Sequence, residues 1–156
     1  MANTQSMCTS FMSELMTATH NFGTAPTRGA STADTFKAAL YLTTATVNAS
    51  TTAYSSTNEV SGTNYTAGGV TVTNATPPTS TNASATAGTA YWTPSASITY
   101  TNVTLTTAFD CVLIYNSTQS NKAVSVHTFG SQTVTAGTFS LTMPVNAAGT
   151  ALLNIA

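Results

Sequence analysis

The sequence predicts an all-β protein: an antiparallel β-sandwich of about seven or eight strands after a short N-terminal helix. Two observations predict this fold. After residue 34, apolar and polar residues alternate with a period of two in short runs, which clusters of Gly, Pro, Asn and Ser separate. Thr, Val, Tyr and Phe, which suit half-buried pleated surfaces, are frequent in these runs. Because periodicity does not fix strand order, a jelly roll and an immunoglobulin-like topology both stay open.

The N-terminal part, residues 1–33, is expected to form a helix and an arm, and residues 34–156 the sandwich domain. Apolar residues spaced three and four apart predict the helix over residues 7–19. Its apolar stripe has two interpretations: it caps the core of its own domain, or it docks onto a neighbouring subunit. For the second, the candidate assembly-interface residues are Phe11, Met12, Leu15 and Met16. Residues 21–33, with two glycines and a proline, are expected to be a loop.

The first strand is expected to begin after Asp34, where Phe36, Ala38, Leu40 and Leu42 alternate with their neighbours as in a half-buried strand. Residues 58–69 are rich in turn formers. Val70 and Val72 then alternate with threonines as in a second strand. Residues 75–88 have low complexity and two adjacent prolines, which a strand ladder excludes, so they predict a long surface loop.

The second half of the chain holds the clearer strands. Residues 109–115 form the most continuous apolar run, which is typical of a central strand buried on both faces. A polar turn is expected at 116–121, and a bulge near Asn102. The strand candidates in this half are 91–92, 98–105, 109–115, 124–127, 139–143 and 153–155.

The composition limits the function. Only 4% of the residues are charged, and Thr, Ala, Ser and Asn contribute 36, 24, 17 and 12 of the 156 residues. Three Lys and Arg residues cannot follow a phosphate backbone, so we expect no nucleic-acid partner. No apolar run is long enough to span a membrane. A net charge of −1 favours association between protein molecules. The alternative is a soluble monomer whose surface is hydrated through its hydroxyl groups. We expect a subunit of an assembly.

Few residues offer chemistry, and common catalytic, nucleotide and zinc motifs are missing from the sequence. We therefore expect no enzyme, no cofactor and no metal site. Asp110, inside an apolar run, is expected to pair with Arg28, Lys37 or Lys122, or to sit at a strand edge. The alternative is a catalytic pair with His127 across a hairpin.

The remaining polar and aromatic residues have structural interpretations. We expect Glu59 to bind turn amides, His20 to lie at a helix C-terminus, and Cys8 and Cys111 to be free thiols. Tyr91, Trp92, Tyr100 and Tyr115 are more typical of packing than of a sugar-binding platform.

Five segments of the chain carry a further signal: CTSFMSEL (8–15), HNF (20–22), DTFKAALYLTTATVNASTTAY (34–54), NEVSGTNYTAGGV (58–70) and LIYNSTQSNKAV (113–124). They resemble small Thr/Ala/Ser-rich virion proteins of tailed bacteriophages. The resemblance implies a non-enzymatic capsid decoration, or cement, protein that binds the major capsid protein or other virion proteins. It also implies a homo-oligomer, for which we expect a trimer, made in the bacterial cytoplasm and located in the virion. The alternative is a tail or head-fibre component, with a receptor- or glycan-binding role.

Overall fold

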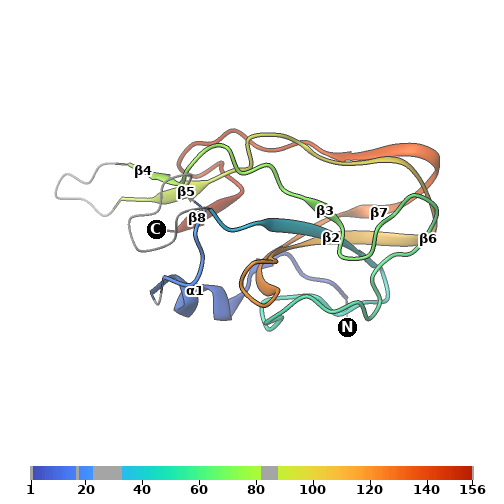
Figure 1. Cartoon of the computed structure of the whole chain (residues 1–156), viewed down its shortest axis with the longest axis horizontal. Coiled ribbons are helices and arrows are strands. Elements are labelled where there is room, and N and C mark those ends of the chain that lie inside the picture. The colour runs from blue at the N-terminus through green and yellow to red at the C-terminus, as the bar shows by residue number, and fades with distance from the viewer. Residues whose placement is uncertain (1, 17, 23–32, 82–87, 156) are drawn as a thin grey trace.

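The computed structural model describes residues 2–16, 18–22, 33–81 and 88–155 (Figure 1). Eight strands and one helix follow each other in these ranges: β1 (Ser6–Met7), α1 (Thr9–Met16), β2 (Phe36–Leu42), β3 (Val70–Thr71), β4 (Thr79–Ser80), β5 (Ala90–Trp92), β6 (Ile98–Asn116), β7 (Lys122–Leu141) and β8 (Leu153–Ile155). The strands form two antiparallel sheets, in the orders β1-β7-β6-β2-β3 and β4-β5-β8. The predicted all-β, sandwich-like fold with a short N-terminal helix is therefore confirmed.

A long hairpin of β6 and β7 dominates the larger sheet. The two strands have 19 and 20 residues and pair along their whole length, and Figure 1 shows the hairpin turning back over itself at one end of the molecule. Register shifts interrupt the pairing between Tyr100 and Cys111, and bulges of this kind let a strand bend. The bend brings the two ends of β6 into opposite layers, where Tyr100 Oη donates a hydrogen bond to the Ala38 carbonyl oxygen of β2 (2.7 Å).

The bend explains where the predicted strand boundaries were wrong. The candidates 98–105 and 109–115 are one strand, and the candidate 124–127 is continuous with residues 139–141 of the candidate 139–143. The bulge expected near Asn102 is confirmed, because its φ is +52° and the register shifts between Tyr100 and Val103. The turn between the two strands lies at 117–121, close to the prediction.

The central strands confirm one burial prediction and correct another. In β6, Cys111 to Tyr115 are all buried, as the apolar run predicts. The half-buried pattern predicted for β2 is wrong, because Ala39 and Tyr41 are buried as well. The segment after β2 explains this: it covers the second face, and Tyr41 Oη donates a hydrogen bond to the Ser55 carbonyl oxygen.

The N-terminal part packs against the strands. β1 pairs with β7, and Cys8, Phe11 and Phe22 belong to the same hydrophobic core as the strand residues. The helix is shorter than predicted because Met7 lies in β1. Both cysteines are free, as expected, and both are buried. Of the segment predicted as a long loop, Thr79–Ser80 form β4, while residues 82–87 lie outside the described ranges.

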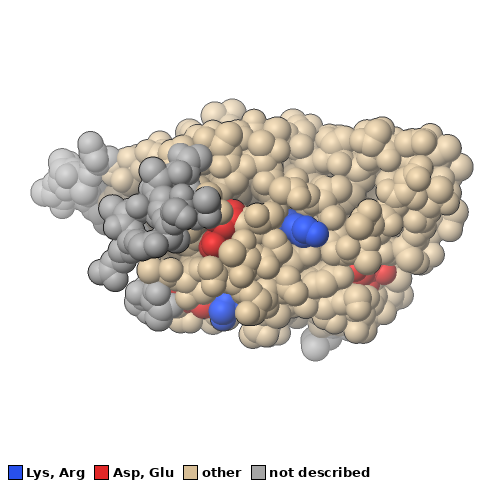
Figure 2. All heavy atoms as spheres, in the orientation of Figure 1, with Lys and Arg blue, Asp and Glu red and all other residues tan. Residues whose placement is uncertain are grey.

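The few charges are confined to part of the chain. Residues 60–109 and 123–156 contain no Asp, Glu, Lys or Arg, so β3, β4, β5 and β8 and almost all of β7 are uncharged. Figure 2 shows the consequence on one face of the molecule: the described charged side chains lie in its middle and lower part, and the upper part has none.

Candidate functional site: an apolar pocket beside helix α1

A pocket of about 250 Å³ lies between α1 and the three-stranded sheet. Its lining residues are Phe11, Leu15, Phe22, Pro78, Ala90, Tyr91, Trp92, Leu153 and Ile155. The walls are almost wholly apolar, so the pocket can accept a hydrophobic group but offers little to orient a polar substrate. Two of the four predicted interface residues, Phe11 and Leu15, line it.

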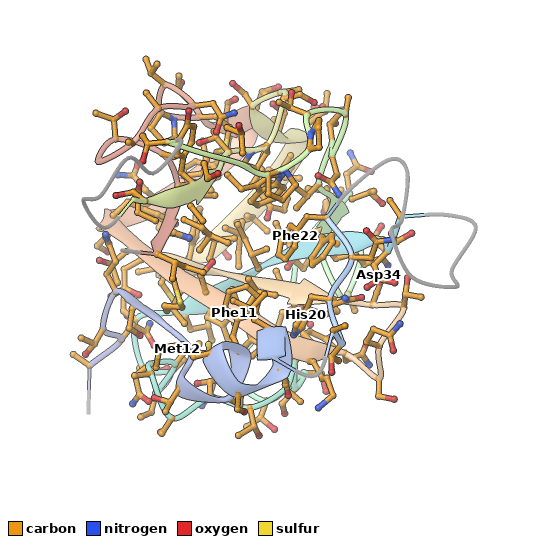
Figure 3. The ribbon with its side chains drawn as sticks, turned by 90° about the vertical axis from the view of Figure 1, so that its left-hand side faces the viewer. Phe11, Met12, His20, Phe22 and Asp34 are labelled. Carbon is orange, nitrogen blue, oxygen red and sulfur yellow. The ribbon has the colours of Figure 1, made fainter. Side chains whose placement is uncertain are left out.

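On the helix side, neighbouring residues have opposite roles. Phe11 is 1% exposed and packs edge-on against the Phe22 ring, with 5.9 Å between centroids. Met12 is 51% exposed, and Figure 3 shows the two side chains leaving the helix in different directions. Leu15 is half-buried, and the Met16 side chain lies outside the described part of the structure. The helix therefore caps its own core through Phe11, while Met12 faces outward.

On the sheet side, Trp92 forms the floor. Its ring packs against Phe22, with 4.7 Å between centroids, and it is 2% exposed. Its Nε1–H lies within hydrogen-bond distance of Asn74 Oδ1 (3.0 Å) and of the Thr76 carbonyl oxygen (3.1 Å). A buried indole needs such an acceptor, and these two fix the ring's orientation.

A partly buried polar network fixes α1 beside the pocket. Glu14 Oε1 accepts a hydrogen bond from Lys122 Nζ (2.6 Å), and Glu14 Oε2 lies 2.7 Å from His20 Nε2. The other ring nitrogen of His20 lies 3.1 Å from Asn116 Nδ2, which is a donor. His20 Nδ1 must therefore accept, so the neutral ring carries its proton on Nε2 and donates it to Glu14.

Asp34 continues the network to the start of β2. Its Oδ2 accepts hydrogen bonds from Asn116 Nδ2 (2.7 Å) and from the backbone amide of Asn21 (2.8 Å). Asn116 Oδ1 in turn accepts the amides of Thr118 and Gln119 in the β6–β7 turn. The network thus connects the helix, the arm, the start of β2 and the hairpin turn. Figure 3 labels two of its members, His20 and Asp34.

The pKa directions in this network fit a structural role. Burial lowers the pKa of His20, and its contact with Glu14 opposes this change. Burial raises the pKa of Glu14, but the hydrogen bonds from Lys122 and His20 outweigh it, so the net pKa is lowered. The His20 side chain is 0% exposed and is not among the pocket's lining residues, so it cannot reach a substrate there. His20 lies beside the last turn of α1, near the helix C-terminus as expected, and its contact there is with the Glu14 side chain.

Asp110 and His127, the catalytic pair considered as the alternative, have different hydrogen-bond partners in the structure. Asp110 Oδ1 accepts a hydrogen bond from Asn3 Nδ2 (2.6 Å), whereas His127 Nε2 lies 2.9 Å from Ser125 Oγ. Ser125 is 0% exposed, so its hydroxyl cannot act as a nucleophile on a substrate from solution. Asp110 therefore has a structural partner, although Asn3 stands where we expected a cation.

Glu59 binds a turn amide, as predicted, and two tyrosines as well. Its Oε1 accepts hydrogen bonds from the Gly68 amide (2.7 Å) and from Tyr65 Oη (2.8 Å), and its Oε2 accepts one from Tyr54 Oη (2.6 Å). Of the aromatic residues considered for a sugar platform, Trp92, Tyr100 and Tyr115 are buried. They do not form an exposed platform.

His127 should make stability depend on pH. It lines a small cavity with apolar side chains of both layers, and burial lowers its pKa to about 4. The unfolded chain binds a proton near pH 6.5 and the folded chain does not, so stability is complete above about pH 6.5 and falls toward pH 4. We expect His127 to contribute roughly 2–3 kcal/mol of this loss.

Urea unfolding at several pH values measures this loss. H127Q, which does not titrate, should lose less stability than the wild type between pH 6.5 and 4, while H20Q should keep the His127 contribution. Equal slopes for H127Q and the wild type would show that His127 is not the titrating group.

The described ranges lack two further classes of site. They contain no cluster of three or more His, Cys, Asp or Glu side chains placed to hold a metal ion. None of their helices is long and apolar enough to cross a membrane.

Comparisons with family models, with curated proteins and with solved structures gave no match. The resemblance to phage virion proteins therefore stays a prediction from the sequence.

Part of the pocket could be predicted from the sequence, since Phe11, Leu15, Tyr91 and Trp92 stand out there, although for different roles. Phe22, Leu153 and Ile155 could not be predicted as pocket residues, because their positions along the chain give no signal that they meet. The Glu14–His20 contact was also missed, since a spacing of six residues across a helix end matches no helical pairing rule.

Proposed function

We propose that this chain is a non-enzymatic structural protein of a bacteriophage virion: a capsid decoration protein that binds the major capsid protein and stabilises the head. The observation that carries the proposal is the placement of charge. Residues 60–109 and 123–156 contain no charged side chain. These two ranges include all or most of six of the eight strands. A surface of this kind is unusual for a domain that must stay dispersed in water.

The described carboxylates support the proposal because they serve internal contacts. Glu14 pairs with Lys122, Asp34 with Asn116, Glu59 with two tyrosines and Asp110 with Asn3. The remaining surface is rich in hydroxyl and small apolar groups, which a partner can cover without removing charges from water. The cores of protein interfaces are depleted of charge in the same way.

In this proposal, each copy covers a junction between capsid subunits and adds its binding free energy to the shell. The outward side of α1, with Met12, contacts the capsid, and the chain associates with further copies of itself. Because few charges take part, binding should change little with ionic strength.

Quantitative mass spectrometry of purified particles tests the proposal. A ratio to the major capsid protein of roughly one to one, or one to a few, is expected for a protein that follows the symmetry of the shell. The chain should also stay on the particles when salt is raised to about 1 M, where the Debye length is about 3 Å.

Two outcomes would contradict it. A ratio below about one to twenty would indicate that the chain belongs to the tail or to a fibre, whose parts follow a smaller symmetry. Absence from the particle would remove the virion role altogether.

A further inference from the structure

The apolar pocket beside α1 has no part in the proposed function. Its walls come from several separate parts of the chain: α1, the arm that follows it, the residue before β4, and the strands β5 and β8. Its volume of about 250 Å³ exceeds that of an engineered apolar cavity of roughly 150 Å³ that binds benzene. The pocket therefore has room for a molecule built on one ring.

The three buried aromatic rings of the pocket, Phe11, Phe22 and Trp92, hold each other in place. Phe22 meets Phe11 and Trp92 edge-on, with ring centroids 5.9 and 4.7 Å away. The Trp92 indole N–H is bound by Asn74 and by the Thr76 carbonyl oxygen. A site whose walls are already fixed loses little side-chain freedom when a ligand enters, so more of the contact energy appears as affinity.

The mouth of the pocket consists of lining residues that solvent reaches. Leu15 and Tyr91 are half-buried, and Pro78, Ala90 and Ile155 are exposed. The three buried rings lie deeper in the pocket than these residues. The pocket is therefore open to a ligand from solvent on this side.

The chemistry of the walls selects the kind of ligand. The described lining residues carry no charge, and the walls are almost wholly apolar. A charged or strongly polar group inside would lose its hydrogen bonds to water without replacement. Four of the lining side chains, Phe11, Phe22, Tyr91 and Trp92, are aromatic, and such rings prefer edge-to-face or offset contacts with another ring.

We propose that this pocket binds a small, uncharged aromatic molecule. The ligand's ring extends the edge-to-face cluster of Phe11, Phe22 and Trp92. A free molecule is favoured over an aromatic side chain of a partner protein. Such a side chain would bring its polar main chain against the apolar side chains of the mouth, where it loses hydrogen bonds to water.

The inference goes beyond the proposed function and does not depend on it. The purified chain tests the pocket, whereas the composition of particles tests the virion role, so the two can fail separately.

Titration of the purified full chain with toluene tests the pocket. The readout is the indole N–H signal of Trp92 in proton–nitrogen correlation NMR spectra, which is unique because the chain has one tryptophan. Toluene should shift this signal saturably, with a Kd below about 1 mM. Benzoate has the same ring with a charge, and should bind at least about tenfold more weakly, because the pocket offers its carboxylate no partner.

Two variants reduce the space in the pocket from opposite walls. L15F enlarges a lining side chain of α1, and A90F enlarges one of β5 at an exposed position. Each should weaken toluene binding at least about tenfold, because the added ring competes for the same volume. M12F is the matched control for L15F: Met12 leaves the same helix in a different direction from Phe11 and does not line the pocket (Figure 3). M12F should bind toluene like the wild type, and the dispersed amide signals in the same spectra show that each variant is folded.

Three results would overturn the inference. The first is a Trp92 signal that toluene does not shift saturably in the folded wild type. The second is toluene binding as tight as in the wild type in both L15F and A90F. The third is benzoate binding as tightly as toluene.

Discussion

Replacing Gly69 with alanine should lower the free energy of unfolding by roughly 3–5 kcal/mol, the sum of a strained backbone and a steric clash. Gly69 has a φ of +72°, a left-handed conformation that alanine adopts at a cost. A Cβ at this position would also meet backbone, the Ala38 carbonyl oxygen, at a separation far inside van der Waals contact. Because Ala38 lies in central strand β2, the clash cannot relax by rotation of a side chain.

The position explains why the effect should be large. Gly69 immediately precedes β3, and its neighbour Gly68 connects the turn to the rest of the fold. The Gly68 amide donates to Glu59, and its carbonyl oxygen accepts a hydrogen bond from Tyr115 Oη (2.8 Å). A shift of the turn that relieves the clash would therefore strain these contacts too.

Urea denaturation followed by the fluorescence of Trp92, the single and buried tryptophan, measures the change. Two glycine variants separate its causes. Gly149 has a φ of +81° but open space around its added Cβ, so G149A isolates backbone strain of about 1 kcal/mol. Gly130 has open space and no positive φ, so G130A should be nearly neutral. If G69A costs no more than G149A, the close approach to Ala38 is absent.

The second large effect concerns Phe11. Its replacement by alanine should cost about 3–5 kcal/mol, the usual range for a buried phenylalanine. The ring is 1% exposed and touches the Phe22 and His20 rings, with centroids 5.9 and 4.9 Å away. Its removal would enlarge the apolar pocket and loosen the contact between α1 and the sheets. The same denaturation experiment measures it.

Met12 provides the control on the same helix. It is 51% exposed, so M12A should change the free energy of unfolding by less than about 0.5 kcal/mol. If the outward side of α1 binds the capsid, M12A should instead lower the copy number on particles without a loss of fold. Equal destabilisation by F11A and M12A would contradict the burial pattern of the helix.

Much of the fold could be predicted from the sequence because strands and turns leave local patterns. The run at 109–115 predicted a buried central strand, and the polar stretch at 116–121 predicted the hairpin turn; both predictions are confirmed. The bulge near Asn102 was found as well. The strand boundaries were predicted wrongly. The polar Thr106 and Thr107 suggest the end of a strand, whereas β6 continues there through a bend.

The candidate site was harder to predict because it joins distant segments. Phe11, Trp92 and Leu153 meet in one pocket although more than fifty residues separate each from the next. The residues expected to form an assembly interface also divide between two environments: Phe11 is buried in the chain's own core and Met12 is exposed. A helical stripe shows that a face is apolar, but not which surface covers it.

Composition and local periodicity were enough to predict the class of the fold, the free thiols and the scarcity of charge. They gave no sign that β6 and β7 fold back over themselves, or that Glu14 meets His20 and Asn116 meets Asp34. The physical reason is that these features depend on which strands pair and where bulges bend them. The packing of the whole core selects which distant strands pair. The alternation of apolar and polar residues along one segment does not show which strand will be its partner.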